Sequence, residues 1–301
     1  MSALQGRRPV LVGVDGSEPA LRAVRWAALE ARRLQVPLRV VTASGDRGIR
    51  HLTRLDLGPD YREAVLEVAR AQVAAATDVA RKAAPGVEVT SDVLAADPVP
   101  ALLEESRQAR LVVLGNRGLG GFSGLLAGSV TVAVTAHATC PVVVVRGAEQ
   151  DPGVAENGPV VVGVDGSPLS DAALAFAFAD AEAHGSALVA VHAWQDMVVD
   201  PNVGAYLDWE AIEREENRLL AEQLAGVAQK YPDVPVDRVV VVRESPARLL
   251  VELSAGARLV VVGARGRGGF TGLLLGSTSQ ALVHHAQCPV AVVRPDQPEH
   301  P

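Results

Sequence analysis

One glycine pattern occurs twice in this chain, once in each half of its 301 residues. The first copy spans residues 115–129 and reads Gly-Asn-Arg-Gly, then nine residues, then Gly-Ser. The second copy, residues 263–277, keeps this spacing and reads Gly-Ala-Arg-Gly before its Gly-Ser. Each copy follows an aliphatic run of the kind that forms a buried strand. We therefore expect each loop to lie at the carboxyl end of a parallel strand and to hold an anion.

The repeat extends well beyond the loops. Val-Leu-Val-Gly-Val-Asp-Gly-Ser at residues 10–17 recurs as Val-Val-Val-Gly-Val-Asp-Gly-Ser at residues 160–167, an offset of 150. Cys-Pro-Val at 140–142 recurs at 288–290, an offset of 148 that the glycine loops share. A period this long indicates two copies of a whole domain. We predict an N-terminal domain over 1–146, a polar linker over 147–158 and a C-terminal domain over 159–301.

Strands and helices are expected to alternate along each half. The chain is 49% hydrophobic but only 3% aromatic, which suits parallel strands buried on both faces by Val, Leu and Ala. Helices are expected to begin near Ser17, Tyr61, Asp97 and Ser129, and near Ser167, Trp209, Ser245 and Ser277. The predicted strands are Val10–Val14, Leu38–Val41, Val87–Val93, Leu111–Leu114 and Val142–Val145 in the first half, and Val160–Val164, Leu188–Val191, Val236–Val242, Leu259–Val262 and Val290–Val293 in the second. This alternation predicts an α/β fold with a parallel sheet and right-handed crossovers.

Charge and composition argue against several classes of partner. A net charge of −7 and a pI near 5.5 disfavour a nucleic-acid or anionic-membrane surface. No apolar run approaches the roughly 20 residues of a membrane helix, and the N-terminus does not read as a secretory signal. Two cysteines do not make a disulfide framework. We therefore expect a soluble cytoplasmic protein.

The chemistry of the loops favours phosphate. Glycines lack a Cβ atom, so backbone N–H groups approach a ligand closely, and Gly-Ser then opens a helix whose free N–H groups attract an anion. Ser129 is expected either to cap that helix or to donate its hydroxyl to a phosphate oxygen. Arg117 and Arg265 either add positive charge or point to solvent. A glycine-rich turn that only reverses the chain is the alternative, since such loops alone are weak signals.

Two other nucleotide motifs are absent. The sequence contains no G-x-x-x-x-G-K-[ST], so there is no P-loop lysine. The dinucleotide fingerprint G-x-G-x-x-G does not match either. Counted from Gly118, its sixth position holds Ser123, and counted from Gly266 it holds Thr271. The loops moreover follow the fourth predicted strand and not the first.

Asp15 and Asp165 end the first strand of each half. Ligands of doubly wound sheets bind outside the carboxyl ends of the strands, where a carboxylate accepts from ribose hydroxyls or helps to hold a metal. The alternative is a turn residue that binds its own backbone within Asp-Gly-Ser. We favour the binding role.

Together these motifs resemble the universal stress protein family in its tandem-domain, ATP-binding form. The resemblance covers nearly the whole chain, and it implies a Rossmann-like five-stranded sheet in the order 3-2-1-4-5 in each domain, with ATP at the switch point. In the first half it implies contacts to adenine and ribose from Gly13, Asp15 and Val41, and to the phosphates from Gly115, Asn116, Arg117, Gly118, Leu119, Gly120, Gly121, Gly128, Ser129 and Val130. In the second half the matching residues are Gly163, Asp165, Val191, Gly263, Ala264, Arg265, Gly266, Arg267, Gly268, Gly269, Gly276, Ser277 and Thr278. The two sites differ at Asn116 and Ala264.

The cysteines and the histidines at helix ends are expected to have structural roles. Cys140 and Cys288 are expected to be small buried hydrophobes. His137 and His285 fall at helix C-termini, where the helix dipole favours them. No nucleophile with a paired base and no metal ligands at zinc spacing are found, so we predict neither catalytic residues nor a structural metal.

We therefore predict a stress-response regulator that binds one ATP per domain, with or without Mg²⁺, and hydrolyses it slowly at most. The resemblance implies a homodimer, and an unidentified protein partner stays open. An adenylyl-transfer enzyme of the same fold is one alternative, with its pocket built by the Ala43–Asp60 and Ala193–Asp208 connections. A nucleotide-free interaction scaffold is the other.

Overall fold

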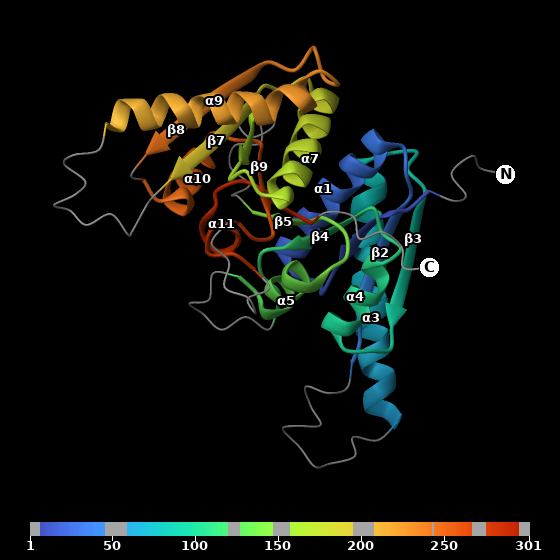
Figure 1. The fold of residues 1–301 in the computed structure, drawn as a ribbon. Helices are drawn as coiled ribbons and strands as arrows, with labels where there is room; N and C mark the ends of the chain where they lie inside the picture. Colours follow the sequence, from blue (N-terminus) through green and yellow to red (C-terminus); the bar gives the residue numbers. More distant parts are fainter. Residues whose placement is uncertain are drawn as a thin grey trace, which may run out of the picture. The chain divides into compact units, whose positions relative to one another are not determined.

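The structure is a computed structural model that describes residues 7–45, 59–119, 127–146, 157–194, 208–242, 244–266 and 275–294. These residues form two compact units, one within residues 1–146 and the other within residues 147–295. Each unit is an α/β domain in which parallel strands alternate with helices (Figure 1). The chain therefore consists of two tandem Rossmann-like domains.

The N-terminal unit follows the predicted order of elements. Its elements are β1 (Val10–Gly13), α1 (Glu18–Leu34), β2 (Leu38–Ala43), α3 (Pro59–Ala83), β3 (Val89–Leu94), α4 (Pro98–Ser106), β4 (Leu111–Gly115), α5 (Ser129–His137) and β5 (Val142–Val145). The strands lie in the order β3-β2-β1-β4-β5 and all pairs are parallel.

The C-terminal unit repeats this plan. Its elements are β6 (Val160–Gly163), α7 (Pro168–His184), β7 (Leu188–Trp194), α9 (Trp209–Ala228), β8 (Val236–Val242), α10 (Pro246–Leu253), β9 (Leu259–Gly263), α11 (Ser277–His285) and β10 (Val290–Val293). The strand order is β8-β7-β6-β9-β10, again parallel throughout.

The strand order determines which face each helix covers. From β1 the chain moves outward through β2 to β3, and then returns to β4 on the other side of β1. Right-handed crossovers therefore place α1 and α3 on one face and α4 and α5 on the other. The packing agrees, because α1 contacts α3 and α4 contacts α5. The connections diverge between β1 and β4, which is the switch point where such sheets bind ligands.

Small aliphatic side chains build the core, as composition predicts. Val10, Val12 and Val112 are fully buried in the central strands of the N-terminal unit. Ala23 and Ala27 on α1 are fully buried too, and their small size lets the helix approach the sheet closely. Cys140 and Cys288 are buried thiols, and their burial was predicted.

Several element boundaries differ from the sequence prediction. Strands β4 and β9 extend one residue further, so that Gly115 and Gly263 belong to the sheet. Helix α3 starts two residues earlier, at Pro59. Asp97 occupies the predicted N-cap of α4, but its side chain makes no capping hydrogen bond.

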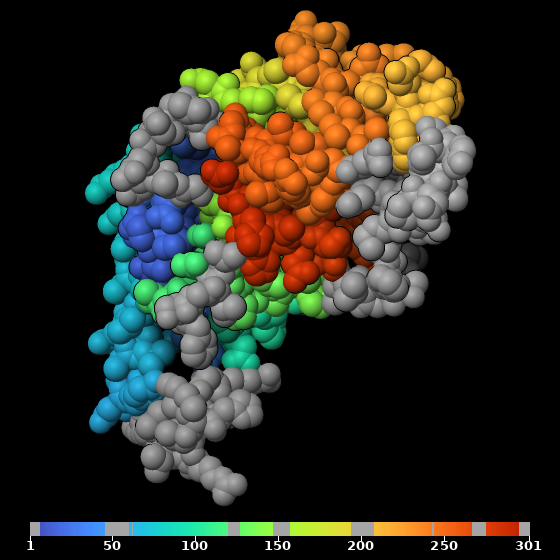
Figure 2. All heavy atoms as spheres, turned by 90° about the vertical axis from the view of Figure 1, so that its left-hand side faces the viewer, coloured from blue at the N-terminus to red at the C-terminus, as the bar shows by residue number. Residues whose placement is uncertain are grey.

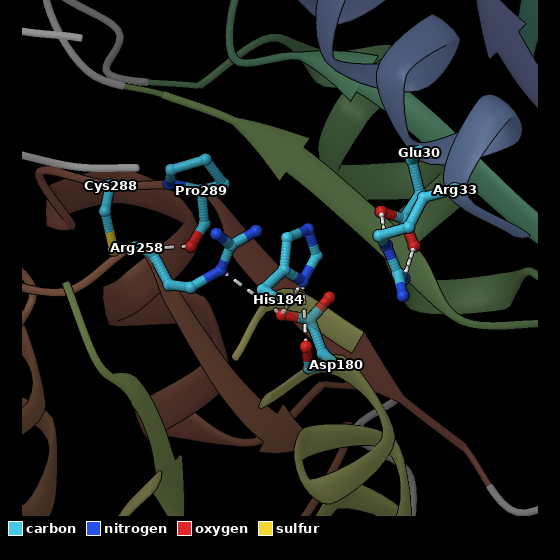
Figure 3. A network of polar contacts seen from close by, with 7 residues as sticks. All are labelled: Glu30, Arg33, Asp180, His184, Arg258, Cys288 and Pro289. Carbon is cyan, nitrogen blue, oxygen red and sulfur yellow. Dashed lines mark hydrogen bonds and ion pairs between the residues drawn. The ribbon is translucent and has the colours of Figure 1, made fainter. Parts of the chain in front are cut away.

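A buried acid on the first helix recurs in both units (Figure 3). Asp180 on α7 is 3% exposed, and its carboxylate lies 3.4 Å from Arg258 Nε and 3.3 Å from His184 Nδ1. The residue 150 positions earlier, Glu30 on α1, is also buried and pairs with Arg33. A buried carboxylate is tolerated only when it is paired, and each unit supplies its own partner.

Helix α3 lies at the surface of the N-terminal unit and is seen along its length as pale blue in Figure 2. Its buried residues lie on one side, among them Ala69, Val73, Ala76 and Ala80. No helix among the described residues is long and apolar enough to cross a membrane.

The stacked pair in the C-terminal unit gives a test of the core. Phe178 is fully buried, and its ring centroid lies 5.6 Å from that of Tyr231. Phe178→Ala is expected to cost about 3–5 kcal/mol and to lower the midpoint of urea unfolding. Phe176→Ala, at a partly exposed position of the same helix, is the matched control and should cost clearly less. Equal losses would contradict the assigned packing.

Candidate functional site

The two predicted parts of each site, the aspartate and the glycine loop, lie together at the switch point of each sheet. Asp15 lies just beyond β1, and the loop that starts at Asn116 lies just beyond the neighbouring β4. Parallel strands end at the same edge, so the aspartate and the loop come together although Asp15 and Leu119 are 104 positions apart in the sequence. Asp165 and the loop after β9 have the same arrangement in the C-terminal unit.

Both oxygens of Asp15 accept backbone hydrogen bonds. Oδ1 accepts from Ser17 N–H at 3.0 Å, which closes the Asp-Gly-Ser turn, and Gly16 supports this turn with φ +85°. Oδ2 accepts from Leu119 N–H at 2.7 Å, which joins the end of β1 to the glycine loop. Asp15 therefore acts as the turn residue that the sequence offered as an alternative. The same carboxylate also holds the glycine loop through Leu119 N–H.

Asp165 forms the same turn in the C-terminal unit. Its Oδ1 accepts from Ser167 N–H at 3.0 Å and from the Ser167 hydroxyl at 2.6 Å. Gly166 supplies the matching positive φ of +74°. The duplicated sequence thus produces a duplicated geometry.

Gly118 and Gly266 are explained by contact with these carboxylates. A Cβ atom on Gly118 would lie 2.2 Å from Asp15 Oδ2, and one on Gly266 would lie 2.5 Å from Asp165 Oδ2. Neither glycine has the positive φ that favours glycine. Lack of a side chain is therefore required for close approach and not for backbone conformation.

The two ends of each loop are fastened together. In the N-terminal unit, Gly128 N–H donates to Asn116 O at 2.9 Å, and the Thr131 hydroxyl donates to Gly115 O at 2.9 Å. In the C-terminal unit, Gly276 N–H donates to Ala264 O at 2.8 Å. The Ser279 hydroxyl donates to Gly263 O at 2.7 Å. Hydrogen bonds thus hold the described ends of each loop together.

Sequence reasoning missed the hydroxyls of Thr131 and Ser279. Each lies 16 positions after the first glycine of its loop, so a hydroxyl residue at one place in both copies was the available signal. Both side chains are directed at the end of the strand they follow and help to fix the base of the loop.

Glycine and not serine caps the helix after each loop. Gly128 and Gly276 are the N-caps of α5 and α11, with φ −72° in both cases. Of the two roles predicted for Ser129, capping is therefore excluded, and donation to a phosphate oxygen stays a prediction. Ser129 and Ser277 are the first helical residues and are exposed. Among the residues that the structure describes, no group hydrogen bonds to either hydroxyl. Both hydroxyls are therefore available to a ligand at the helix start.

The remaining predicted contacts fall into three groups. Arg117 and Arg265 are exposed, whereas Val41 and Val191 are buried in their sheets. Partly buried positions are Gly13, Gly163, Val130 and Thr278. Gly120, Gly121, Arg267, Gly268 and Gly269 lie outside the described residues, as do the larger parts of the Ala43–Asp60 and Ala193–Asp208 connections.

The two sites differ in one buried polar group. The Asn116 Oδ1 atom is buried and has no hydrogen-bond partner among the described residues. The corresponding Ala264 is 1% exposed and carries no polar side chain. The N-terminal site therefore holds an amide group that the C-terminal site lacks.

Comparisons with known proteins identify the same repeat. The model of the universal stress protein family matches residues 6–146 and again residues 156–294. Universal stress protein Rv2005c of Mycobacterium tuberculosis is 41% identical over 305 residues, covering 98% of this chain and 99% of its own. Universal stress protein Rv1996 of the same organism is 42% identical over 318 residues and both chains are fully covered. A universal stress protein from Archaeoglobus fulgidus superposes with TM-score 0.68 at 21% identity, covering 95% of this chain and 96% of its own.

The contact between Gly118 and Asp15 can be tested by a double-mutant cycle. Gly118→Ala is expected to destabilise the N-terminal unit by about 1–3 kcal/mol, because the new methyl group displaces the Asp15 carboxylate. In an Asp15→Ala background the same substitution should cost much less, since the clashing oxygen is gone. Unfolding in urea measures all four proteins.

Gly128→Ala is the control for this cycle. Its Cβ would have no heavy atom closer than 3.7 Å, so no clash arises. An equal cost for Gly118→Ala with and without Asp15 would refute the assignment.

Proposed function

The chain belongs to the universal stress protein family, and from this membership and the loop geometry we propose that each of its two units binds one ATP molecule. The phosphates would lie on the loop and on the first turn of α5 or α11. Adenine and ribose would lie toward Gly13, Asp15 and Val41, or toward their counterparts in the second unit.

The glycine caps of α5 and α11 are the observation that carries this proposal. At three other helix starts a side chain accepts from the first turn: Ser17 from Ala20 N–H, Ser167 from Ser170 N–H and Asp208 from Ala211 N–H. The caps of α4 and α10 carry polar side chains that make no such bond. At α5 and α11 the cap has no side chain and makes no such bond. The N–H groups of the first turn, with the positive end of the helix dipole, therefore face an open position suited to phosphate.

The donors present suit a phosphate group. The exposed Ser129 hydroxyl stands at the first helical position, and Arg117 is exposed on the same loop. Bonds at the base of the loop fix its ends before a ligand arrives, which reduces the entropy lost on binding.

Asp15 fits a second role beside the ribose. A carboxylate has about four lone-pair positions, and backbone N–H groups use two of them here. The remaining positions are suited to ribose hydroxyls or to a Mg²⁺ ion held between the carboxylate and the phosphates. Bound Mg²⁺ would offset the negative charge that ATP brings near Asp15.

The proposed activity is regulation and not rapid turnover. Around the described part of the N-terminal loop, Asp15 is the carboxylate in hydrogen-bond contact, and both its oxygens already accept N–H donors. It is thus poorly placed to activate water, and hydrolysis would be slow at most. ATP would act by its difference in affinity for two arrangements of the protein, in the cytoplasm and within a homodimer or with a further protein partner.

A substitution at the glycine cap of α5 can lower ATP affinity without lowering the stability of the fold. Gly128→Asp places a carboxylate at the N-cap, where it stabilises the helix but occupies its N–H groups and repels phosphate. The expected result is unchanged or slightly higher thermal stability with ATP affinity lowered about tenfold or more in the N-terminal unit. Calorimetric titration with Mg-ATP measures the affinity, and the number of bound ATP per chain should fall from about two to about one.

Gly128→Ala is the matched control, because it adds a side chain without charge or capping group. It should bind ATP far better than Gly128→Asp. Absence of Mg-ATP binding by the unmodified chain would overturn the proposal and favour a nucleotide-free scaffold. Rapid release of AMP or pyrophosphate with a second substrate would instead favour adenylyl transfer.

A further inference from the structure

A groove in the N-terminal unit lies at the edge of the sheet opposite the candidate nucleotide site. It is lined by the chain before β1, by the start of β2 and by the end of α4, a helix that packs against both strands (Figure 1). Arg110 N–H donates to Pro9 O at 2.9 Å and holds the beginnings of β4 and β1 together here. Asp15 and the glycine loop follow the carboxyl ends of the same two strands. The groove is therefore separate from the nucleotide site.

Arginines dominate the charge of this groove. The charged side chains that line it are four arginines and two glutamates, which together give a formal charge of +2: Arg7, Arg8, Arg39, Arg107, Glu104 and Glu105. We call it the arginine groove. The whole chain carries a formal charge of −7, so the groove is a positive site on an acidic protein. A site of this kind attracts negatively charged groups.

Both glutamates are already paired within the groove. Arg39 donates to Glu105 through two nitrogens, at 2.6 Å and 2.7 Å. Arg107 Nη1 donates to Glu104 at 2.6 Å. These pairs hold two guanidinium groups in place and offset the charge of both carboxylates. The surplus positive charge therefore comes from the two exposed arginines that precede β1.

The guanidinium groups keep hydrogen-bond donors for a ligand. Each guanidinium has five N–H donors in a planar fork that fits a carboxylate. One nitrogen of Arg7 donates to Gln35 O at 3.1 Å, and one nitrogen of Arg107 donates to Glu104. The other donors of these two side chains have no partner within the part of the chain that the structure describes. Arg7 and Arg107 can therefore each bind a carboxylate without giving up the bonds they make.

The size and lining of the groove suit a short peptide. Its volume is about 640 Å³, which is far more than a single inorganic anion fills. Ligand pockets of roughly 300–1,000 Å³ hold molecules with several functional groups. Pro9, Leu11 and Ala109 line the groove beside the charged side chains. An acidic peptide matches both features, because glutamate and aspartate side chains carry a carboxylate on an apolar stem.

The C-terminal unit provides an internal comparison, because it lacks the arginines of this groove. Uncharged residues occupy the four corresponding positions: Asn157, Gly158, Val189 and Ala255. A Cβ atom on Gly158 would lie 2.4 Å from Gly256 O, so a side chain at the position of Arg8 has no room there. Both units nevertheless have the same order of strands. The fold therefore does not require the arginines.

We propose that the arginine groove binds a short acidic segment of a partner protein, and that the C-terminal unit has no such site. Carboxylates of the segment would pair with Arg7, Arg8 and Arg107, while its apolar stems would contact the uncharged lining. This interaction goes beyond the proposed binding of ATP and does not depend on it, because the two sites lie at opposite edges of the sheet.

Two synthetic peptides test the proposal. Fluorescein-labelled hexaglutamate and its neutral counterpart hexaglutamine are titrated with the full chain, and fluorescence anisotropy measures binding. We expect hexaglutamate to bind about tenfold or more tightly than hexaglutamine. Its affinity should fall with added NaCl, because salt screens charges at the surface. A chain with both Gly128→Asp and Gly276→Asp should bind hexaglutamate as the unmodified chain does, since the nucleotide sites take no part.

The surplus charge of the groove is tested by removing it. Arg7→Gln together with Arg8→Gln should lower the affinity for hexaglutamate about tenfold or more. Arg70→Gln together with Arg81→Gln is the matched control, because it removes the same charge from exposed positions on α3 of the same unit. This control should stay within about twofold of the unmodified chain. Thermal unfolding of each variant checks that the fold is retained.

A second variant separates direct contact from general attraction. Glu104→Gln together with Arg107→Gln keeps the formal charge of the groove and removes one guanidinium. Both side chains are exposed, so the fold should be unaffected. The affinity for hexaglutamate should fall about threefold or more, because a bidentate donor is lost.

Four results would overturn the proposal. They are equal binding of hexaglutamate and hexaglutamine, an equal loss of affinity in the α3 control, an unchanged affinity after Glu104→Gln with Arg107→Gln, and displacement of the peptide by an equal concentration of inorganic phosphate. The last result would assign the groove to a small anion. Failure of the chain to bind Mg-ATP while it binds hexaglutamate would refute the proposed function alone.

Discussion

The neighbouring positions of β1 and β4 are the constraint on which the candidate site depends. The chain leaves β1 toward one face of the sheet and leaves β4 toward the other, because right-handed crossovers run in opposite directions from this pair. Their carboxyl ends are thus close together while the helices that follow diverge. Asp15 and the glycine loop occupy the space this divergence opens, and the hydrogen bond from Leu119 N–H to Asp15 closes it at its base. The same reasoning applies to β6 and β9.

At the helix caps, local stability and the proposed phosphate binding favour different residues. A serine, threonine, aspartate or asparagine cap typically stabilises a helix by about 1 kcal/mol relative to alanine, whereas glycine is only slightly less favourable than these. Ser17 and Ser167 make such side-chain bonds at the helices that follow the first strand of each unit. Gly128 and Gly276 leave the corresponding N–H groups unoccupied. The small loss of helix stability is expected in both units. It leaves N–H donors without a side-chain cap at the helix start beside the switch point.

The sequence predicted what is set locally and missed what depends on distant contacts. Aliphatic runs and the repeat identified the ten strands found among the described residues, and helix α5 begins at Ser129 as expected. The role of Gly118 was not predictable, because the atom that excludes a side chain there belongs to Asp15, more than a hundred residues away. The capping alternative for Ser129 failed for a similar reason: the bond from Gly128 N–H to Asn116 O holds Gly128 in the N-cap position.

Duplication lets the two units of this family member keep the same contacts at the base of the loop while the residues behind the loop differ. Residues that touch the loop are constrained by geometry in both units, as the paired clashes at Gly118 and Gly266 indicate. Residues one layer behind are less constrained, since Thr42 and His192 both fit a buried position on the second strand of their sheets. Only the histidine reaches both a strand-end carbonyl and a helix carboxylate. One buried position behind the site thus joins β7 to the end of β6 in the C-terminal unit, while the glycine cap and the aspartate are the same in both units.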